Sequence, residues 1–271
     1  MSKTWFITGA SRGFGRSWTE AALRRGDKVA ATARDIATLK DLADEFGDAI
    51  LPITLDVTDR AAAITAVGQA KAHFGRLDVV VNNAGYGHFG FLEEITEAEA
   101  RAQLETNVFG ALWVTQAAIP LMREQGSGHI VQISSVGGVA AFPGLGMYHA
   151  SKWALEGLSE ALSQEVASFG IKVTLIEPGG YATDWSGSSS VHSEPNPAYQ
   201  AMRDARAQGR AGYQAPGPDA TTAAVFAAVD AENPPLRLLL SGVAYDIAQR
   251  VYQQRLDTWS EWEATSRSAQ A

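Results

Sequence analysis

Short apolar runs alternate with longer segments of helical period along about nine tenths of the chain, and this alternation limits the possible folds more than any other feature. Strand-like runs lie at residues 4–8, 28–33, 50–54, 79–82, 129–133, 172–176 and 236–240. Segments of helical period lie at residues 15–25, 36–46, 60–74, 97–124, 147–169 and 219–228. Strands that alternate with helices build a parallel sheet covered on both faces. The sequence therefore predicts an α/β fold with a doubly wound, seven-stranded parallel sheet in a single domain over residues 1–271.

Residues 186–197 interrupt the alternation, because eight of these twelve residues are Ser, Gly or Pro. Such a run predicts a mobile loop, which continues into a short helix near residues 199–207. A linker between two domains is the alternative. Because a helix and a strand still follow, we interpret residues 184–217 as a substrate lid at the carboxyl edge of the sheet. Residues 243–271 predict a C-terminal helical extension.

The composition excludes several classes of site. The chain has 22 basic and 30 acidic residues, a net charge of −8, which argues against nucleic-acid or anionic-membrane binding, although a local basic pocket can still hold a phosphate. With no cysteine, it has no disulfide, thiol nucleophile or thiolate zinc site. Its five histidines show no metal-ligand spacing, so we expect no metal. The longest apolar run, residues 223–229, is too short to span a bilayer, and we expect a soluble cytoplasmic protein.

The first predicted strand runs into a glycine-rich turn, TGASRGFG at residues 8–15, which opens the first helix. Glycines let a backbone approach a pyrophosphate closely, and the start of a helix supplies free N–H groups and the positive end of its dipole. A purely structural turn is the alternative. The position between first strand and first helix favours a Rossmann-type dinucleotide site. The residues expected to contact the cofactor here are Gly9, Ser11, Arg12, Gly13, Phe14 and Gly15.

The end of the second strand indicates which dinucleotide is bound. A cofactor with free ribose hydroxyls favours an acidic residue at this position, whereas a 2′-phosphate favours a cation. The chain has Arg34 here, and Arg12 lies in the glycine turn. Two arginines at one spot suit a dianionic phosphate, so we predict NADP(H) rather than NAD(H). Alternatively, Arg34 is a solvated surface charge and Asp35 caps the next helix.

Polar residues also follow the third and fourth strands. Asp56 can accept a hydrogen bond from an adenine amine, or it can simply cap the next turn. The asparagines of NNAG, residues 82–85, can shape the floor of the cofactor site or be wholly structural. We assign to cofactor binding Asp56, Val57, Asn83, Ala84 and Gly85.

Ser135, Tyr148 and Lys152 form the constellation that indicates chemistry. Tyr148 and Lys152 are four residues apart and lie on one face of a predicted helix, and Ser135 follows the fifth strand. A phenol ionises near pH 10, and a neighbouring ammonium brings its pKa closer to neutrality. The phenol can then exchange a proton with an alcohol or carbonyl oxygen that Ser135 holds. A tyrosine and lysine at this spacing often arise by chance, so the interpretation depends on their combination with the serine and the glycine turn.

Together the motifs TGASRGFG, NNAG, Ser135, YHASK (148–152) and PG (178–179) resemble the short-chain dehydrogenase/reductase family, in order from about residue 4 to 183. The resemblance implies that Tyr148 is the general acid/base, that Ser135 orients the substrate oxygen, and that Lys152 lowers the tyrosine pKa and binds the nicotinamide ribose. It also implies a water-linked proton relay at Asn107, and nicotinamide contacts at Pro178, Gly179 and Thr183. Family members suggest a homo-dimer or homo-tetramer.

These observations predict an NADP(H)-dependent oxidoreductase that interconverts a ketone or aldehyde and the corresponding alcohol. The wider sequence resembles a branch related to carbonyl reductases and 17β-hydroxysteroid or retinol dehydrogenases. We expect a hydrophobic small-molecule substrate beside Gly137, Phe142, Tyr181 and Trp185, and beside residues of the mobile loop. The alternatives are an epimerase or dehydratase on the same scaffold, and a non-catalytic protein that senses NADP.

Overall fold

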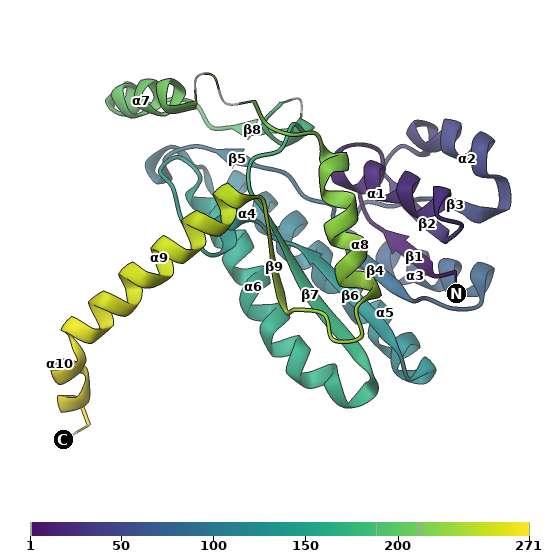
Figure 1. Cartoon of the computed structure of the whole chain (residues 1–271). Helices are drawn as coiled ribbons and strands as arrows, with labels where there is room; N and C mark the ends of the chain where they lie inside the picture. The colour runs from purple at the N-terminus through teal and green to yellow at the C-terminus, as the bar shows by residue number, and fades with distance from the viewer. Residues whose placement is uncertain (1, 188, 211, 213, 271) are drawn as a thin grey trace.

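A parallel sheet of seven strands forms the centre of the protein, in the order β3-β2-β1-β4-β6-β7-β9 (Figure 1). The structure, a computed structural model, describes residues 2–187, 189–210, 212 and 214–270. The seven predicted strands are confirmed, with some ends shifted by one or two residues. Their bounds are β1 (Thr4–Ile7), β2 (Lys28–Ala33), β3 (Ile50–Thr54), β4 (Val79–Asn82), β6 (Gly128–Ile133), β7 (Ile171–Pro178) and β9 (Arg237–Leu240).

Helices pack on both faces of this sheet, which is the predicted doubly wound, single-domain arrangement. Consecutive residues of β1 point to opposite faces, so Trp5 and Ile7 enter one core and Phe6 enters the other. The first core lies under α1 (Gly13–Arg24), α2 (Lys40–Phe46) and α8 (Thr222–Asp230). The second lies under α3 (Arg60–Phe74), α5 (Ala111–Gln125) and α6 (Gly146–Val166). Burial on both faces explains why the strands read as continuous apolar runs.

The order of the strands reverses between β1 and β4. From β1 the chain proceeds outward to β2 and β3, and it then returns to β4 and builds the other half of the sheet. In open parallel sheets a crevice forms at the carboxyl ends of the strands on either side of such a point. The segments after β1, β4, β6 and β7 therefore meet at one edge, where the functional site is expected.

The predicted helix at residues 97–124 is divided into two. α4 (Glu97–Leu104) is followed by a π-helical turn (Glu105–Gly110), and α5 begins at Ala111. The apolar period continues across the turn, so the sequence did not reveal the division. A π turn inside a helix often accompanies a functional site, and this one contains Asn107. Similarly, residues 36–39 form a 3₁₀ turn, capped by Asp35, before α2.

A second, two-stranded parallel sheet joins β5 (His88–Phe89) to β8 (Val191–His192). Strands this short have no readable period, and neither was predicted. β8 places a paired strand within residues 186–197, expected to be a loop, although Ser188 lies outside the described residues. The predicted short helix is present as α7 (Gln200–Arg210). Residues 211 and 213 of the expected lid also lie outside the described part.

The C-terminal tail is helical, as predicted, with α9 (Gly242–Glu261) and α10 (Glu263–Ser268); residue 271 lies outside the described residues. Figure 1 shows α9 projecting away from the sheet. Within the described part of the chain, no helix has the length and apolar character needed to cross a bilayer.

A partly buried charged cluster holds the edge strand β9 to α6. The Arg237 guanidinium lies 2.9 Å from a Glu156 oxygen, 2.8 Å from a Glu160 oxygen and 3.6 Å from a Glu177 oxygen. Burial and the mutual repulsion of two close carboxylates raise the pKa of Glu177, and burial also raises that of Glu156. The cluster fixes α6, the helix that carries Tyr148, against the end of the sheet.

Candidate active site

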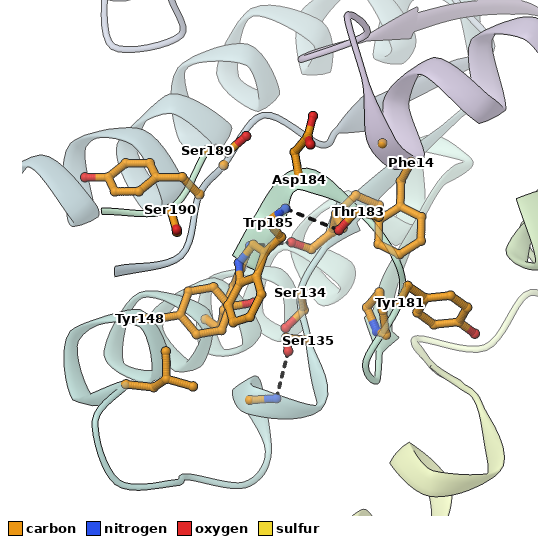
Figure 2. A pocket seen from close by; sticks show the side chains of 18 of the residues that line it. Phe14, Ser134, Ser135, Tyr148, Tyr181, Thr183, Asp184, Trp185, Ser189 and Ser190 are labelled. Carbon is orange, nitrogen blue, oxygen red and sulfur yellow. Dashed lines mark hydrogen bonds between the residues drawn. The ribbon is translucent and has the colours of Figure 1, made fainter. Parts of the chain in front are cut away.

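A cavity of about 1300 Å³ opens at the carboxyl edge of the sheet. Its lining includes nearly all the residues predicted to bind the cofactor or take part in catalysis: Gly9, Ser11, Arg12, Gly13, Phe14, Arg34, Asp56, Val57, Asn83, Ala84, Gly85, Ser135, Tyr148, Lys152, Pro178, Gly179 and Thr183. Gly15 and Asn107 instead lie behind this surface. Figure 2 shows the region around Tyr148 and Ser135.

Hydrogen bonds tie the glycine turn to the end of β4. The Thr8 hydroxyl accepts from the backbone N–H groups of Asn83 and Ala84, each at 2.9 Å. The Asn83 side chain donates to the carbonyl oxygens of Thr8 and Gly9, at 2.9 and 3.1 Å. Asn83 therefore has the structural role that was one of its two interpretations, while also lining the cavity.

Gly15 acts through close approach. A Cβ atom at this position would lie 2.4 Å from the Gly9 carbonyl oxygen and 2.5 Å from Asn83 Nδ2. Only glycine lets α1 start this near the turn, which brings the free N–H groups at the start of the helix to the cavity. The turn therefore has the shape needed to cradle a pyrophosphate.

Arg12 and Arg34 line the same cavity, as the NADP(H) interpretation requires. Arg12 Nε lies 3.7 Å from a carboxylate oxygen of Asp184, an acidic partner that sequence reasoning missed. Both side chains are about half exposed, so solvent screens the pair and leaves Arg12 available to a phosphate. The glycine cradle and these two cations fit a nicotinamide dinucleotide.

Asp56 caps a turn, which was one of its two interpretations. Its carboxylate accepts from the Thr58 N–H at 3.0 Å and the Thr58 hydroxyl at 2.8 Å. The Thr58 hydrogen bonds lower the Asp56 pKa, with a smaller contribution from the charge of Arg34. Asp56 is thus an ionised acceptor at the cavity wall.

Tyr148 and Lys152 extend from one face of α6, and Ser135 lies in the turn after β6. Tyr148 is 5% exposed, and the Lys152 ammonium lies 5.8 Å from the centre of its ring. Lys152 Nζ donates to the Ile133 carbonyl oxygen at 2.7 Å. The Ser135 hydroxyl accepts from the Gly137 N–H at 2.9 Å (Figure 2). Two hydroxyls and a buried ammonium therefore meet at the cavity.

Burial dominates the pKa of Tyr148 in this arrangement, and the expectation that Lys152 lowers it stays a prediction. Burial raises the pKa of Tyr148 to about 12, and the Ser135 hydroxyl opposes this. Burial lowers the pKa of Lys152 to about 8, against a raising contribution from Glu156. The Lys152 ammonium donates to a backbone carbonyl oxygen and lies 5.8 Å from the centre of the phenol ring. The protein alone keeps Tyr148 neutral and able to donate a proton.

Asn107 is buried behind Gly85. Its amide accepts from the Tyr86 N–H and donates to the Tyr86 carbonyl oxygen and to the Ser151 hydroxyl, all at 3.1 Å. A Cβ on Gly85 would lie 3.0 Å from Asn107 Oδ1 and 3.8 Å from Lys152 Nζ. Asn107 and Lys152 therefore both lie close to Gly85, and the Asn107 side chain joins the turn after β4 to α6.

Of the four residues expected to face the substrate, all line the cavity. The Trp185 ring packs on the Tyr148 ring with centres 4.9 Å apart (Figure 2). Tyr181 packs edge-on against Phe14 at 5.3 Å, so it belongs to the cofactor side. The remaining two are Gly137 and Phe142.

The apolar wall comes from β8, α7, α9 and segments near α6. Its residues include Phe91, Leu145, His149, Val191, Met202, Val243 and Ile247. Val191 and Met202 lie in the predicted lid, and sequence reasoning missed the rest. Tertiary packing of distant segments brings these together, and no spacing in the sequence indicates it. For His149 alone a cue was present, because it directly follows Tyr148 in the YHASK motif. Among the described residues, no group of His, Asp and Glu could hold a metal.

Comparison with known proteins establishes the family. A family model described as short chain dehydrogenase matches residues 3–193. Oxidoreductase BOA17 of Botryotinia fuckeliana is 42% identical over 270 residues, 98% of each chain. A short-chain dehydrogenase structure from Streptomyces avermitilis has a TM-score of 0.92 and 43% identity, covering 99% of each chain.

Two Burkholderia structures in the comparison contain cofactors. The B. phymatum protein, in complex with NAD, has a TM-score of 0.80 and 25% identity, covering 94% of this chain and 95% of that one. The B. cenocepacia protein, in complex with NADP, has a TM-score of 0.77 and 26% identity, covering 96% and 97%.

The chain therefore belongs to the short-chain dehydrogenase family, which confirms the resemblance. It is an oxidoreductase on a Rossmann-type fold, and its family uses a nicotinamide cofactor.

The close contacts at Gly15 predict that adding one methyl group there lowers stability and weakens cofactor binding. Gly15→Ala should lower the melting temperature by roughly 2–12 °C, since overpacking costs about 1–3 kcal/mol in a chain of this size. It should also weaken NADPH binding, because the helix start must move. Thermal unfolding and fluorescence titration with NADPH measure the two effects.

Gly68→Ala is the matched control, since Gly68 lies exposed on α3 with no atom within 4 Å of a Cβ. It should leave NADPH binding unchanged and raise stability by up to about 1 kcal/mol. Equal behaviour of the two variants would contradict the close-approach argument.

Proposed function

We propose that this oxidoreductase uses NADP(H) to interconvert a ketone or aldehyde and its alcohol. The observation that carries the proposal is that the Ser135 and Tyr148 side chains line the same cavity as the glycine turn, with a buried ammonium beside the phenol. A bound carbonyl compound can therefore meet two hydroxyls next to the cofactor site. When bound, the nicotinamide supplies the hydride.

Tyr148 donates the proton in the reducing direction. Reduction places negative charge on the substrate oxygen, and a neutral phenol can hydrogen-bond to that oxygen and then protonate it. The raised pKa, about 12, keeps the phenol in this form. Ser135 holds the same oxygen and stabilises its developing charge.

Lys152 supports the phenol electrostatically. With a pKa of about 8, the Lys152 side chain is predominantly an ammonium at neutral pH. Its charge favours the phenolate that forms when Tyr148 gives up its proton. Asn107, beside Lys152 behind Gly85, lies on the path by which a proton from water could return to Tyr148.

The preference for NADP(H) rests on Arg12 and Arg34. Both line the cavity, and the position after β2 has no carboxylate to accept ribose hydroxyls. Charge-assisted hydrogen bonds from two guanidinium groups suit a 2′-phosphate.

The substrate side of the cavity suits a hydrophobic molecule. Phe91, Phe142, Leu145 and Met202 provide an apolar wall opposite the polar edge of Tyr148 and Ser135. We infer that the described residues of the segment 184–217 cover this side as a lid. Exposed apolar side chains on the projecting tail support a homo-dimer or homo-tetramer, among them Tyr252, Leu256, Trp259 and Trp262.

Replacing the phenol tests the function. Tyr148→Phe should lower kcat by roughly 10²- to 10⁴-fold, because it removes the proton donor, and should leave the Kd for NADPH nearly unchanged. The measurement is loss of NADPH absorbance on a panel of ketones and aldehydes. Tyr245→Phe, an exposed position on α9, is the control and should retain full activity. Wild-type protein that reduces no carbonyl compound, or a fully active Tyr148→Phe, would refute the proposal.

Replacing Arg34 tests the cofactor assignment. Arg34→Ala should lower kcat/KM for NADPH roughly 10- to 100-fold, the value of one or two lost charge-assisted contacts, and change kcat/KM for NADH less than about twofold. Arg24→Ala removes an exposed arginine of α1 that pairs with Glu20 and serves as the control. The assignment fails if wild type prefers NADH, or if the Arg34 variant loses both activities equally.

A further inference from the structure

His149 is a buried group next to the catalytic tyrosine that the proposed chemistry does not use. It is 4% exposed and follows Tyr148 on α6. Its Nδ1 lies 2.9 Å from the Gly137 carbonyl oxygen, and its Nε2 accepts from the Phe142 N–H at 2.9 Å. One imidazole ring therefore spans the loop that joins Ser135 to α6.

These two contacts define the protonation state of the ring. The Phe142 N–H can only donate, so Nε2 must be an unprotonated acceptor, and the Gly137 carbonyl can only accept, so Nδ1 must carry the proton. The neutral Nδ1–H tautomer satisfies both partners. In an imidazolium, the Nε2–H group would face the Phe142 N–H group, and the hydrogen bond between Phe142 and the ring would be lost.

Through Gly137 the ring reaches the catalytic serine. The Gly137 N–H donates to the Ser135 hydroxyl at 2.9 Å, and its carbonyl oxygen bonds to His149. A Cβ on Gly137 would lie 2.7 Å from His149 Nδ1, so ring and turn are in direct contact. At the other end of the loop, the Phe142 ring meets His149 edge-on at 5.5 Å and lines the cavity.

We propose that His149 is a positioning residue that fixes the Ser135 hydroxyl and the Phe142 wall relative to Tyr148, and that protonation of its ring opens this link. The inference rests on the proposed function of Ser135 and Tyr148. To that function the inference adds that His149 sets the distance between the Ser135 and Tyr148 hydroxyls.

The surroundings keep the ring neutral. Burial is the largest cause that lowers the His149 pKa, the charge of Arg206 on α7 adds to it, and the hydrogen bond to the Gly137 carbonyl oxygen opposes both. The loop at residues 136–145 contains no titratable side chain, and on α6 the nearest such groups in sequence are Tyr148 and Lys152. Since the folded pKa is below the ordinary 6.5, the link is complete at neutral pH and is lost as the pH falls through the folded pKa.

His149→Phe keeps a ring of similar size and removes both nitrogens. We expect kcat to fall roughly 10- to 100-fold, as for a misplacement of about 1 Å between reacting groups, with the NADPH Kd within about twofold of wild type. The decline in wild-type kcat at acidic pH that follows the His149 titration should be absent. His149→Gln, whose amide can donate and accept, should recover part of kcat. His129→Gln is the control. His129 is a buried histidine at the amino end of β6 that bonds to Thr174 on β7, and its replacement should leave kcat and the pH profile of kcat unchanged.

Imidazole ¹⁵N spectra of the wild-type protein test the link without relying on turnover or on the folding of a variant. The His149 resonances, assigned by selective labelling, should show a neutral Nδ1–H ring from pH 8 down to below 6.5. An Nε2–H tautomer or a charged ring at pH 7 would overturn the proposal, as would a wild-type kcat in folded His149→Phe. If His149→Phe does not fold, the test uses His149→Gln. A folded His149→Gln that has lost both its activity and its NADPH binding would also overturn the proposal. Failure to reduce any carbonyl compound would instead refute the proposed function and leave the tautomer result standing.

Discussion

The hydrogen-bond cluster between Thr8 and Asn83 is the interaction on which the site depends. β1 and β4 pair in the sheet as far as Ile7 and Val81, but the segments that follow them lie beyond the ladder and need other bonds to hold them together. The Thr8 hydroxyl bonds to two N–H groups after β4 and to the Val81 carbonyl oxygen at 3.3 Å. The Asn83 amide returns two bonds to the glycine turn. With the turn fixed in this way, Gly15 lets α1 begin close enough to present its N–H groups to the cavity.

Burial determines the protonation state of Tyr148, and Lys152 places a positive charge near it. A buried tyrosine with a pKa of about 12 is protonated at neutral pH, which is the form that can donate a proton to a substrate oxygen. The Lys152 ammonium lies near the phenol and donates a hydrogen bond to the Ile133 carbonyl oxygen, which holds the ammonium in place. The overall charge of −8 thus coexists with a local group of cations, Arg12, Arg34 and Lys152, along one cavity.

Sequence patterns predicted the fold well because each strand of the sheet is buried on both faces and reads as an apolar run between helices. They also predicted that the glycines, Ser135, Tyr148 and Lys152 would meet at one edge of the sheet, because these residues lie in loops and on one helix face whose geometry follows from local spacing. Their roles in cofactor binding and catalysis stay predictions. Three things could not be read. The π turn at Asn107 leaves the apolar period intact. The apolar wall depends on packing between distant segments. The raised Tyr148 pKa depends on the burial of the phenol by tertiary packing.

Transfer of deuterium from NADPH labelled at nicotinamide C4 tests the central claim, that the chain delivers hydride and proton to the two atoms of one carbonyl group, most directly. The account predicts that product alcohol formed in ordinary water carries the label on its carbon, and that its oxygen-bound proton comes from Tyr148 and hence from solvent. Oxidation of the labelled cofactor with no deuterium on the product carbon would contradict it.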